Sequence, residues 1–149
     1  MKPKILLRIA AILILVHALL HTSGFSQWKN DPDPAKHEVI KQMTGQKFAF
    51  MGTSRNMGNY YDGFGYATSI ALFLFAILLW LVSCELSANP SLAKKVIAVL
   101  SFALLLWAID EMIYFFPFAV VLSLVASICG FGALIGVGKQ GRPDKTIIA

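Results

Sequence analysis

Histidine and carboxylate side chains lie inside two of the apolar stretches of this chain, where ionisable groups are rare. His17 and His21 stand near the end of the first stretch, and Asp110 and Glu111 stand near the end of the third. Histidines four residues apart project from one face of a helix, a spacing that lets them share a metal ion or relay a proton. A carboxylate in hydrocarbon needs a partner or water. These four residues are therefore the candidates for catalysis.

The depth of these residues suggests that they meet. Counting about 1.5 Å per residue from the inner end of each stretch puts all four between about 18 and 24 Å. Adjacent helical residues point about 100° apart, so only one carboxylate can face the histidines squarely. Small Ala103 on the side of Asp110 favours Asp110 as the interior carboxylate. The pattern predicts a divalent-metal site of His17, His21 and Asp110, or an acid/base set that includes Glu111.

Three residues before the second apolar stretch could extend this cluster. Arg55 follows Thr53 and Ser54, and Tyr61 and Asp62 belong to a segment rich in glycine and tyrosine. If this segment folds over the outer opening, the extended cluster could bind a metal, protonate a substrate or hold an acidic headgroup. We take Arg55, Tyr61 and Asp62 as the candidate binding residues. A structural ion-pair network that fixes helix packing is the alternative.

Four apolar stretches must position these residues. The chain has 149 residues, of which 57% are hydrophobic and only 14% charged, too little polar surface for a soluble globule. Stretches of about 18 to 21 residues match a hydrocarbon core of about 30 Å. The predicted fold is all-α: a polytopic membrane protein with one domain over residues 1–149 and four transmembrane helices in an antiparallel bundle. The predicted spans are about 5–25, 65–83, 96–116 and 118–138.

The first span could be a cleaved signal peptide, because basic residues precede it. Its apolar stretch is long and no clear cleavage pattern follows, so we predict a retained helix, with cleavage as the alternative. The polar loop at about 26–62 holds Asp-Pro repeats that predict a helix start. Val39, Ile40 and Met43 then recur at helical spacing, which indicates a short interfacial helix over 35–44. A loop helix packed on the mouth of the bundle fits equally well.

Charge sets the expected orientation. The net charge is +5, but the basic residues lie in short clusters beside the spans and form no basic face with stacking aromatics, so we expect no nucleic-acid partner. The positive-inside rule predicts that both termini are cytoplasmic and that the 26–62 loop lies outside, in a plasma membrane of the bacterial inner type. The clusters behind this prediction are Lys2, Lys4 and Arg8, then Lys94 and Lys95, then Lys139, Arg142 and Lys145.

The fourth span carries a pair of glycines at G-x-x-x-G spacing, Gly132 and Gly136. Small residues at this spacing let helix backbones approach closely. Packing within the chain is the default expectation. A membrane partner subunit or a homodimer through this pair is the other possibility.

The chain resembles an uncharacterised family of small bacterial four-helix integral membrane proteins. In that group a first helix ending in histidines precedes a Gly-x-Ser-Arg-like turn and a Tyr-x-Gly-Phe-Gly-like start of the second helix. The matching residues are His17, His21 and Gly24, then Gly52, Ser54 and Arg55, then Tyr61, Gly63, Phe64 and Gly65. The resemblance implies the fold and a membrane location, and the group has no established activity to carry over.

Two functions compete at this point. A binding or accessory protein would use Arg55 and the tyrosine-rich segment to engage a lipid headgroup or a partner subunit, beside a polar pocket near the outer leaflet. The alternative is a membrane-embedded enzyme that acts on a lipid-soluble substrate through the histidines and a carboxylate or a bound metal. At the level of architecture alone, the enzyme hypothesis resembles small four-helix sterol isomerases with acidic and histidine residues in a membrane cavity.

Overall fold

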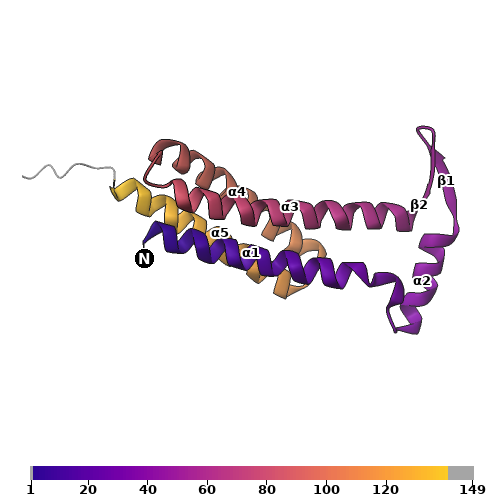
Figure 1. Cartoon of the computed structure of the whole chain (residues 1–149). Coiled ribbons are helices and arrows are strands. Elements are labelled where there is room, and N and C mark those ends of the chain that lie inside the picture. The colour runs from indigo at the N-terminus through magenta and orange to yellow at the C-terminus, as the bar shows by residue number, and fades with distance from the viewer. Residues whose placement is uncertain (1, 141–149) are drawn as a thin grey trace, which may run out of the picture. The chain divides into compact units, whose positions relative to one another are not determined.

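A computed structural model describes residues 2–140, and within them the chain forms five α-helices, one short 3-10 helix and one β-hairpin (Figure 1). Four helices are long and apolar enough to cross a membrane: α1, α3, α4 and α5. The predicted all-α fold with four apolar spans is therefore confirmed. The elements are α1 (Pro3–Ser26), η1 (Trp28–Asn30), α2 (Pro34–Gly45), β1 (Lys47–Phe50), β2 (Thr53–Asn56), α3 (Met57–Glu85), α4 (Pro90–Tyr114) and α5 (Pro117–Gln140).

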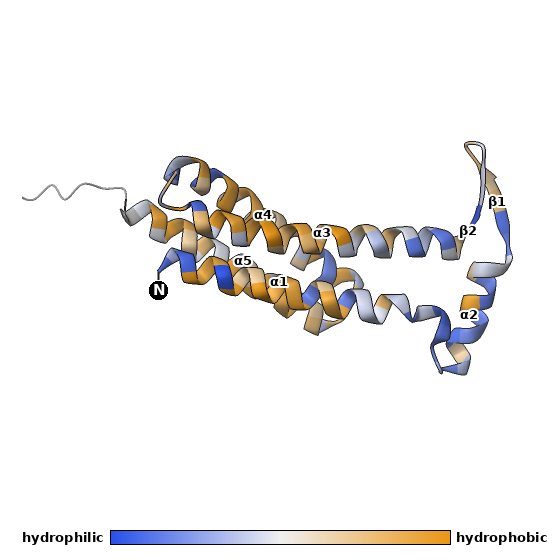
Figure 2. Cartoon of the chain, in the orientation of Figure 1, coloured by the Kyte–Doolittle hydropathy of each residue, from blue (hydrophilic) through white to orange (hydrophobic). Residues whose placement is uncertain are grey.

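The contacts divide the described chain into two compact units. The helical unit comprises residues 2–17 and 73–140, and the hairpin unit comprises residues 18–72. Figure 2 shows apolar residues along the helices of the helical unit and mainly polar residues on α2. Arg142 and Lys145, which contribute to the predicted orientation, lie outside the described residues.

Two helices begin earlier than predicted because side chains cap them. α3 begins at Met57 rather than at about residue 65. Asn56 Oδ1 accepts from the backbone N–H of Asn59 at 2.8 Å, and Asn59 Oδ1 accepts from that of Asn56 at 3.1 Å. This reciprocal pair is an asparagine version of the capping box. α4 begins at Pro90 rather than at about residue 96, because the Asn89 side chain caps it and proline suits the first helical position.

The 26–62 segment contains the predicted short helix and also a hairpin that was not predicted. α2 spans Pro34–Gly45, and Asp33 caps it by accepting from the backbone N–H of Ala35 at 2.9 Å. In the first turn of α2, Lys36 donates to the Asp31 carboxylate at 2.6 Å, and this hydrogen bond lowers the pKa of the Asp31 carboxyl. The strands β1 and β2 are antiparallel.

The turn between the strands explains why the hairpin was missed. Met51 and Gly52 link β1 to β2 with φ values of 48° and 80°. Positive φ at both central residues is typical of the tight hairpin turns that match strand twist. Glycine suits such a turn, but methionine is not among the residues that signal it.

The core of the helical unit combines buried leucine and isoleucine side chains with small residues, and α5 contributes mainly small ones. α4 and α5 are linked through Phe115 and Phe116 alone. The buried stripe of α5 consists of Ala119, Leu122, Ser123, Ala126, Ser127, Gly130, Ala133 and Val137. At Gly130 an added Cβ would overlap the side chain of Ser101 on α4, so the two backbones are in close approach.

The predicted G-x-x-x-G pair packs within the chain. A Cβ built at Gly132 would lie 3.3 Å from Leu6 of α1, and one at Gly136 would lie 2.7 Å from Pro3. The two glycines therefore let the start of α1 approach α5 closely, which agrees with the expectation that this pair packs within the chain.

Candidate functional site

A buried polar cluster in the helical unit joins three helices around His17. The Nε2 atom of His17 on α1 lies 3.2 Å from Oε1 of Glu111 on α4, and Nδ1 lies 3.2 Å from the hydroxyl of Ser123 on α5. Trp107 Nε1, one turn before Glu111, donates to the same carboxylate oxygen at 3.0 Å. We call His17, Trp107, Glu111 and Ser123 the histidine cluster. The predicted contact between a histidine of the first span and a carboxylate of the third span is therefore present.

The carboxylate in this cluster is Glu111, and the expectation that Asp110 faces the interior is wrong. Glu111 is 4% exposed, whereas Asp110 is exposed. The inward face of α4 follows Ser101, Leu104 and Ala108 at helical spacing, and Glu111 continues it. Small residues do mark the packed face, but they are Ser101 and Ala108 rather than the Ala103 on which the prediction relied.

The histidine cluster can hold a proton but is closed to solvent. A neutral imidazole satisfies both contacts if Ser123 donates to Nδ1 and the Nε2–H donates to Glu111. His17 is 6% exposed and Ser123 is 0% exposed. The second carboxylate oxygen of Glu111, Oε2, is buried and has no hydrogen-bond partner among residues 2–140. The arrangement therefore suits either an acid/base pair or a set of buried hydrogen bonds that holds three helices together, which we call a polar lock.

His21, the other predicted metal ligand, has different neighbours in the hairpin unit. Its Nε2 lies 3.3 Å from the carbonyl oxygen of Gly65, and its ring stacks on Phe25 with centroids 5.9 Å apart. Thr22 donates to Ser69 at 3.0 Å, which ties the same helix end to α3. In the part of the chain that the structure describes, no three His, Cys, Asp or Glu side chains form a group that could hold a metal ion. His17, His21 and Asp110 are thus not brought together as a ligand set.

Asp62, a predicted binding residue, forms hydrogen bonds within the hairpin unit through both of its carboxylate oxygens. Its two carboxylate oxygens accept from Trp28 Nε1 at 2.8 Å and from Lys29 Nζ at 2.6 Å. Tyr61 contacts the Trp28 ring with centroids 4.7 Å apart and is 47% exposed. Asp62 therefore positions η1 against α3 and leaves the Tyr61 ring half accessible.

Arg55, the third predicted binding residue, lies on a mixed aromatic and cationic surface of the hairpin. It is opposite Phe48 in the strand register, and Phe50 is opposite Thr53. Alternate strand residues share a face, so these four residues form one surface, which we call the hairpin face. Phe50 at its end is 60% exposed. Sequence reasoning missed Phe48 and Phe50, although their period-two spacing is a strand signal.

A close approach in the hairpin unit yields a testable expectation. An added Cβ at Gly65 would overlap the ring of Phe25. We expect Gly65→Ala to destabilise the protein by about 1 kcal/mol, because the ring must turn out of its packed position. Gly63→Ala is the matched control, since nothing lies within 4 Å of its added Cβ. Thermal unfolding in detergent checks the pair, and equal melting temperatures for the two variants would contradict the packing.

Comparison of the chain with protein-family models, with curated proteins and with solved structures finds no match. Two groups of side chains could carry the function, the histidine cluster and the hairpin face. The histidine cluster is buried between helices. The hairpin face is exposed and combines a cation with two phenylalanine rings, which is a surface suited to binding.

Proposed function

We propose that this chain is a small integral membrane protein with a binding or accessory role, and that the hairpin face is its binding surface. The observation that carries this proposal is the position of Arg55 directly across from Phe48. Arg55 donates to the adjacent Ser54 carbonyl at 2.9 Å, and no carboxylate of the described residues forms an ion pair with it. Its guanidinium remains accessible to an external anion.

The composition of the hairpin face defines the ligand class. Arginine binds carboxylate or phosphate groups through parallel N–H donors, and exposed phenylalanine rings favour apolar contact. The ligand should therefore join negative charge to an apolar surface, as an anionic lipid headgroup or an acidic segment of a membrane partner subunit does. Tyr61 adds a half-exposed ring in the same unit.

Two contacts within the hairpin unit hold this surface in place. Phe48 stacks on Tyr60 with centroids 5.7 Å apart and planes 10° from parallel. Asn56 at the end of β2 donates to the Thr44 carbonyl at the end of α2 at 2.6 Å. A binding surface whose conformation is already set loses less entropy when the ligand binds.

The charge pattern supports a location and an orientation for this function. Basic clusters beside the short segments favour cytoplasmic termini in a plasma membrane, with the 26–62 segment, which contains the hairpin, on the outer side. A homodimer through Gly132 and Gly136 would have to displace Pro3 and Leu6 from those glycines. We therefore infer that a partner, if it is a protein, contacts the hairpin face instead.

Site-specific photo-cross-linking tests the proposed surface. A photoreactive phenylalanine analogue at Phe50 should give a discrete adduct when native membranes are irradiated, because Phe50 is exposed beside the cation. Arg55→Gln should reduce that adduct about tenfold, since the charge-assisted bonds are lost. Mass spectrometry of the adduct identifies it as a phospholipid or a protein segment.

The matched controls use the opposite surface of the hairpin. Lys47 and Ala49 alternate with Phe48 and Phe50, so they lie on the other side of the same strand. The analogue at Ala49 should give little adduct, and Lys47→Gln should leave the Phe50 adduct intact. Equal adducts from positions 49 and 50, or equal effects of the two charge removals, would refute the hairpin face as the binding surface.

A membrane-embedded enzyme is the second candidate, favoured by the buried contact of His17 with Glu111, whose Oε2 has no hydrogen-bond partner among residues 2–140. In that function His17 and Glu111 would exchange a proton with a lipid-soluble substrate. An acid/base pair should lose activity when either member is replaced while the protein stays folded. A polar lock should instead lose stability.

A further inference from the structure

Arg8 is a charged side chain in the apolar stretch of α1. Its guanidinium lies over the ring of Trp80 in the same unit, with the central carbon 4.9 Å from the ring centroid. An aromatic face attracts a cation, but it does not satisfy the N–H donors of a guanidinium as an oxygen acceptor does. The buried Nε of Arg8 has no hydrogen-bond partner among the residues that the structure describes. Arg8 thus retains donors for an acceptor from outside the described chain.

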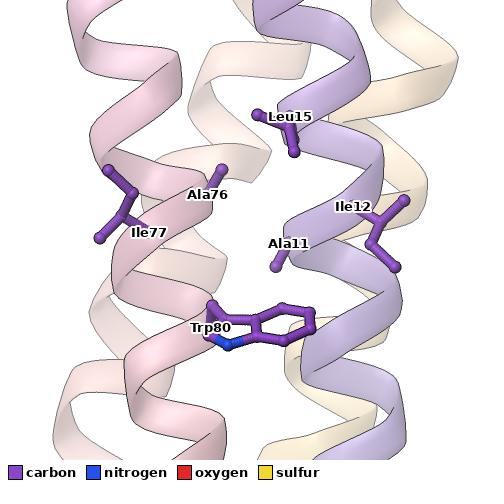
Figure 3. A pocket seen from close by; sticks show the side chains of 6 residues that line it. All are labelled: Ala11, Ile12, Leu15, Ala76, Ile77 and Trp80. Atoms are coloured by element: carbon purple, nitrogen blue, oxygen red, sulfur yellow. The ribbon is translucent and has the colours of Figure 1, made fainter.

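An apolar groove between α1 and α3 starts at the same tryptophan ring (Figure 3). Its volume is about 190 Å³. In Figure 3 Trp80 reaches from α3 toward α1 at one end, and Leu15 stands toward the other end. The lining residues are Ala11, Ile12, Leu15, Ala76, Ile77 and Trp80.

The cation and the groove follow one another along the same face of α1. Ala11 and Ile12 come three and four residues after Arg8, which is the spacing of neighbours on a helix surface. From Arg8 to Leu15 the helix rises about 10 Å. A ligand along this face would meet a positive charge first and then about two turns of apolar side chains.

We propose that Arg8, Trp80 and this groove form a binding site for one anionic phospholipid of the surrounding bilayer. The phosphate oxygens accept from the Arg8 guanidinium, for which paired N–H donors are well shaped. One acyl chain lies in the groove between α1 and α3. An apolar helix of a second copy would fill the groove but would bring no anionic acceptor for the Arg8 guanidinium, so the charge favours the lipid.

Two further cations favour an anionic headgroup over a zwitterionic one. Lys2 and Lys4 are exposed and precede Arg8 on the same helix end. Basic residues at this position relative to a span attract anionic headgroups by about 1 kcal/mol each. The site is separate from the hairpin face and would exist whether or not Arg55 binds a ligand.

Native mass spectrometry of the full chain in neutral detergent tests this site directly. With equal amounts of phosphatidylglycerol and phosphatidylcholine, the wild-type protein should retain one phosphatidylglycerol with a preference of about tenfold. Arg8→Gln should remove most of that preference. Lys4→Gln, which removes one exposed charge from the same helix end, should keep most of it, and Arg55→Gln should keep all of it.

A fluorescence measurement gives a second readout. Phosphatidylglycerol with brominated acyl chains should quench tryptophan emission more strongly than brominated phosphatidylcholine, and Trp80→Phe should remove the difference. Equal retention of the two lipids by the wild-type protein would overturn the proposal, and this comparison needs no variant to fold. Equal losses for Arg8→Gln and Lys4→Gln would also overturn it, because general charge attraction would then explain the binding.

Discussion

Glu111→Ala should lower the free energy of unfolding by about 3 kcal/mol, because it removes the buried carboxylate that faces His17 Nε2 and accepts from Trp107 Nε1. His17→Ala should cost a similar amount, since it leaves the carboxylate of Glu111 without the imidazole that faces it at 3.2 Å. Replacing both residues by leucine should cost less than the sum of the single changes, because only the Trp107 N–H and the Ser123 hydroxyl then lose a partner and neither an imidazole nor a carboxylate is left buried alone. Unfolding in mixed micelles measures the losses, and the single variants His17→Leu and Glu111→Leu measured beside the double leucine variant give the coupling between the two positions.

Asp110→Ala is the control for these variants. It removes a carboxylate from the same turn of α4, but Asp110 is exposed and should change stability by less than about 0.5 kcal/mol. If His17→Ala and Glu111→Ala were as stable as the wild-type protein, the cluster would not be a polar lock between helices. The enzyme hypothesis would then become the stronger one, because a proton-transfer pair can be removed without loss of folding.

The sequence predicted the elements that depend on local chemistry. The four helices follow from runs of apolar residues long enough to span hydrocarbon, and Asp33 with Pro34 correctly indicated the start of α2. The early start of α3 depends on two asparagines that bond one another, a pattern hidden among turn-forming residues. The hairpin was missed because its strands are only four residues long and its turn begins with methionine.

The candidate site was harder to predict because its contacts join distant segments. His17 and Ser123 are 106 residues apart in the chain, and no local pattern indicates that they meet. The choice between Asp110 and Glu111 depended on which face of α4 packs inward, and the position of one small residue was too weak a signal. The chemistry of the two carboxylates is the same, so only packing separates them.

Gly130→Ala should destabilise the helical unit by about 2 to 3 kcal/mol, because its Cβ would overlap the hydroxyl of Ser101. That hydroxyl cannot move freely. It donates to the Ile97 carbonyl at 2.7 Å, while the backbone carbonyl of Ser101 accepts from Ser127 at 2.8 Å. The Ser127 hydrogen bond holds α5 against α4 at Ser101, and the bond to Ile97 holds the Ser101 hydroxyl in place. Thermal unfolding in detergent, followed by circular dichroism, measures the loss.

Combining Gly130→Ala with Ser101→Gly separates this overlap from the helix preference of glycine. With Ser101→Gly, the nearest remaining atom to the new Cβ at position 130 is the Cα of residue 101, at an ordinary 3.6 Å. The double variant should therefore recover most of the stability that Gly130→Ala loses, because glycine has only moved from α5 to α4. Gly138→Ala, whose Cβ meets nothing within 4 Å, should not destabilise the protein. Two results would contradict this account: Gly138→Ala losing as much stability as Gly130→Ala, or the double variant recovering none of the lost stability. Either would show that the close approach of α4 and α5 does not limit the size of residue 130.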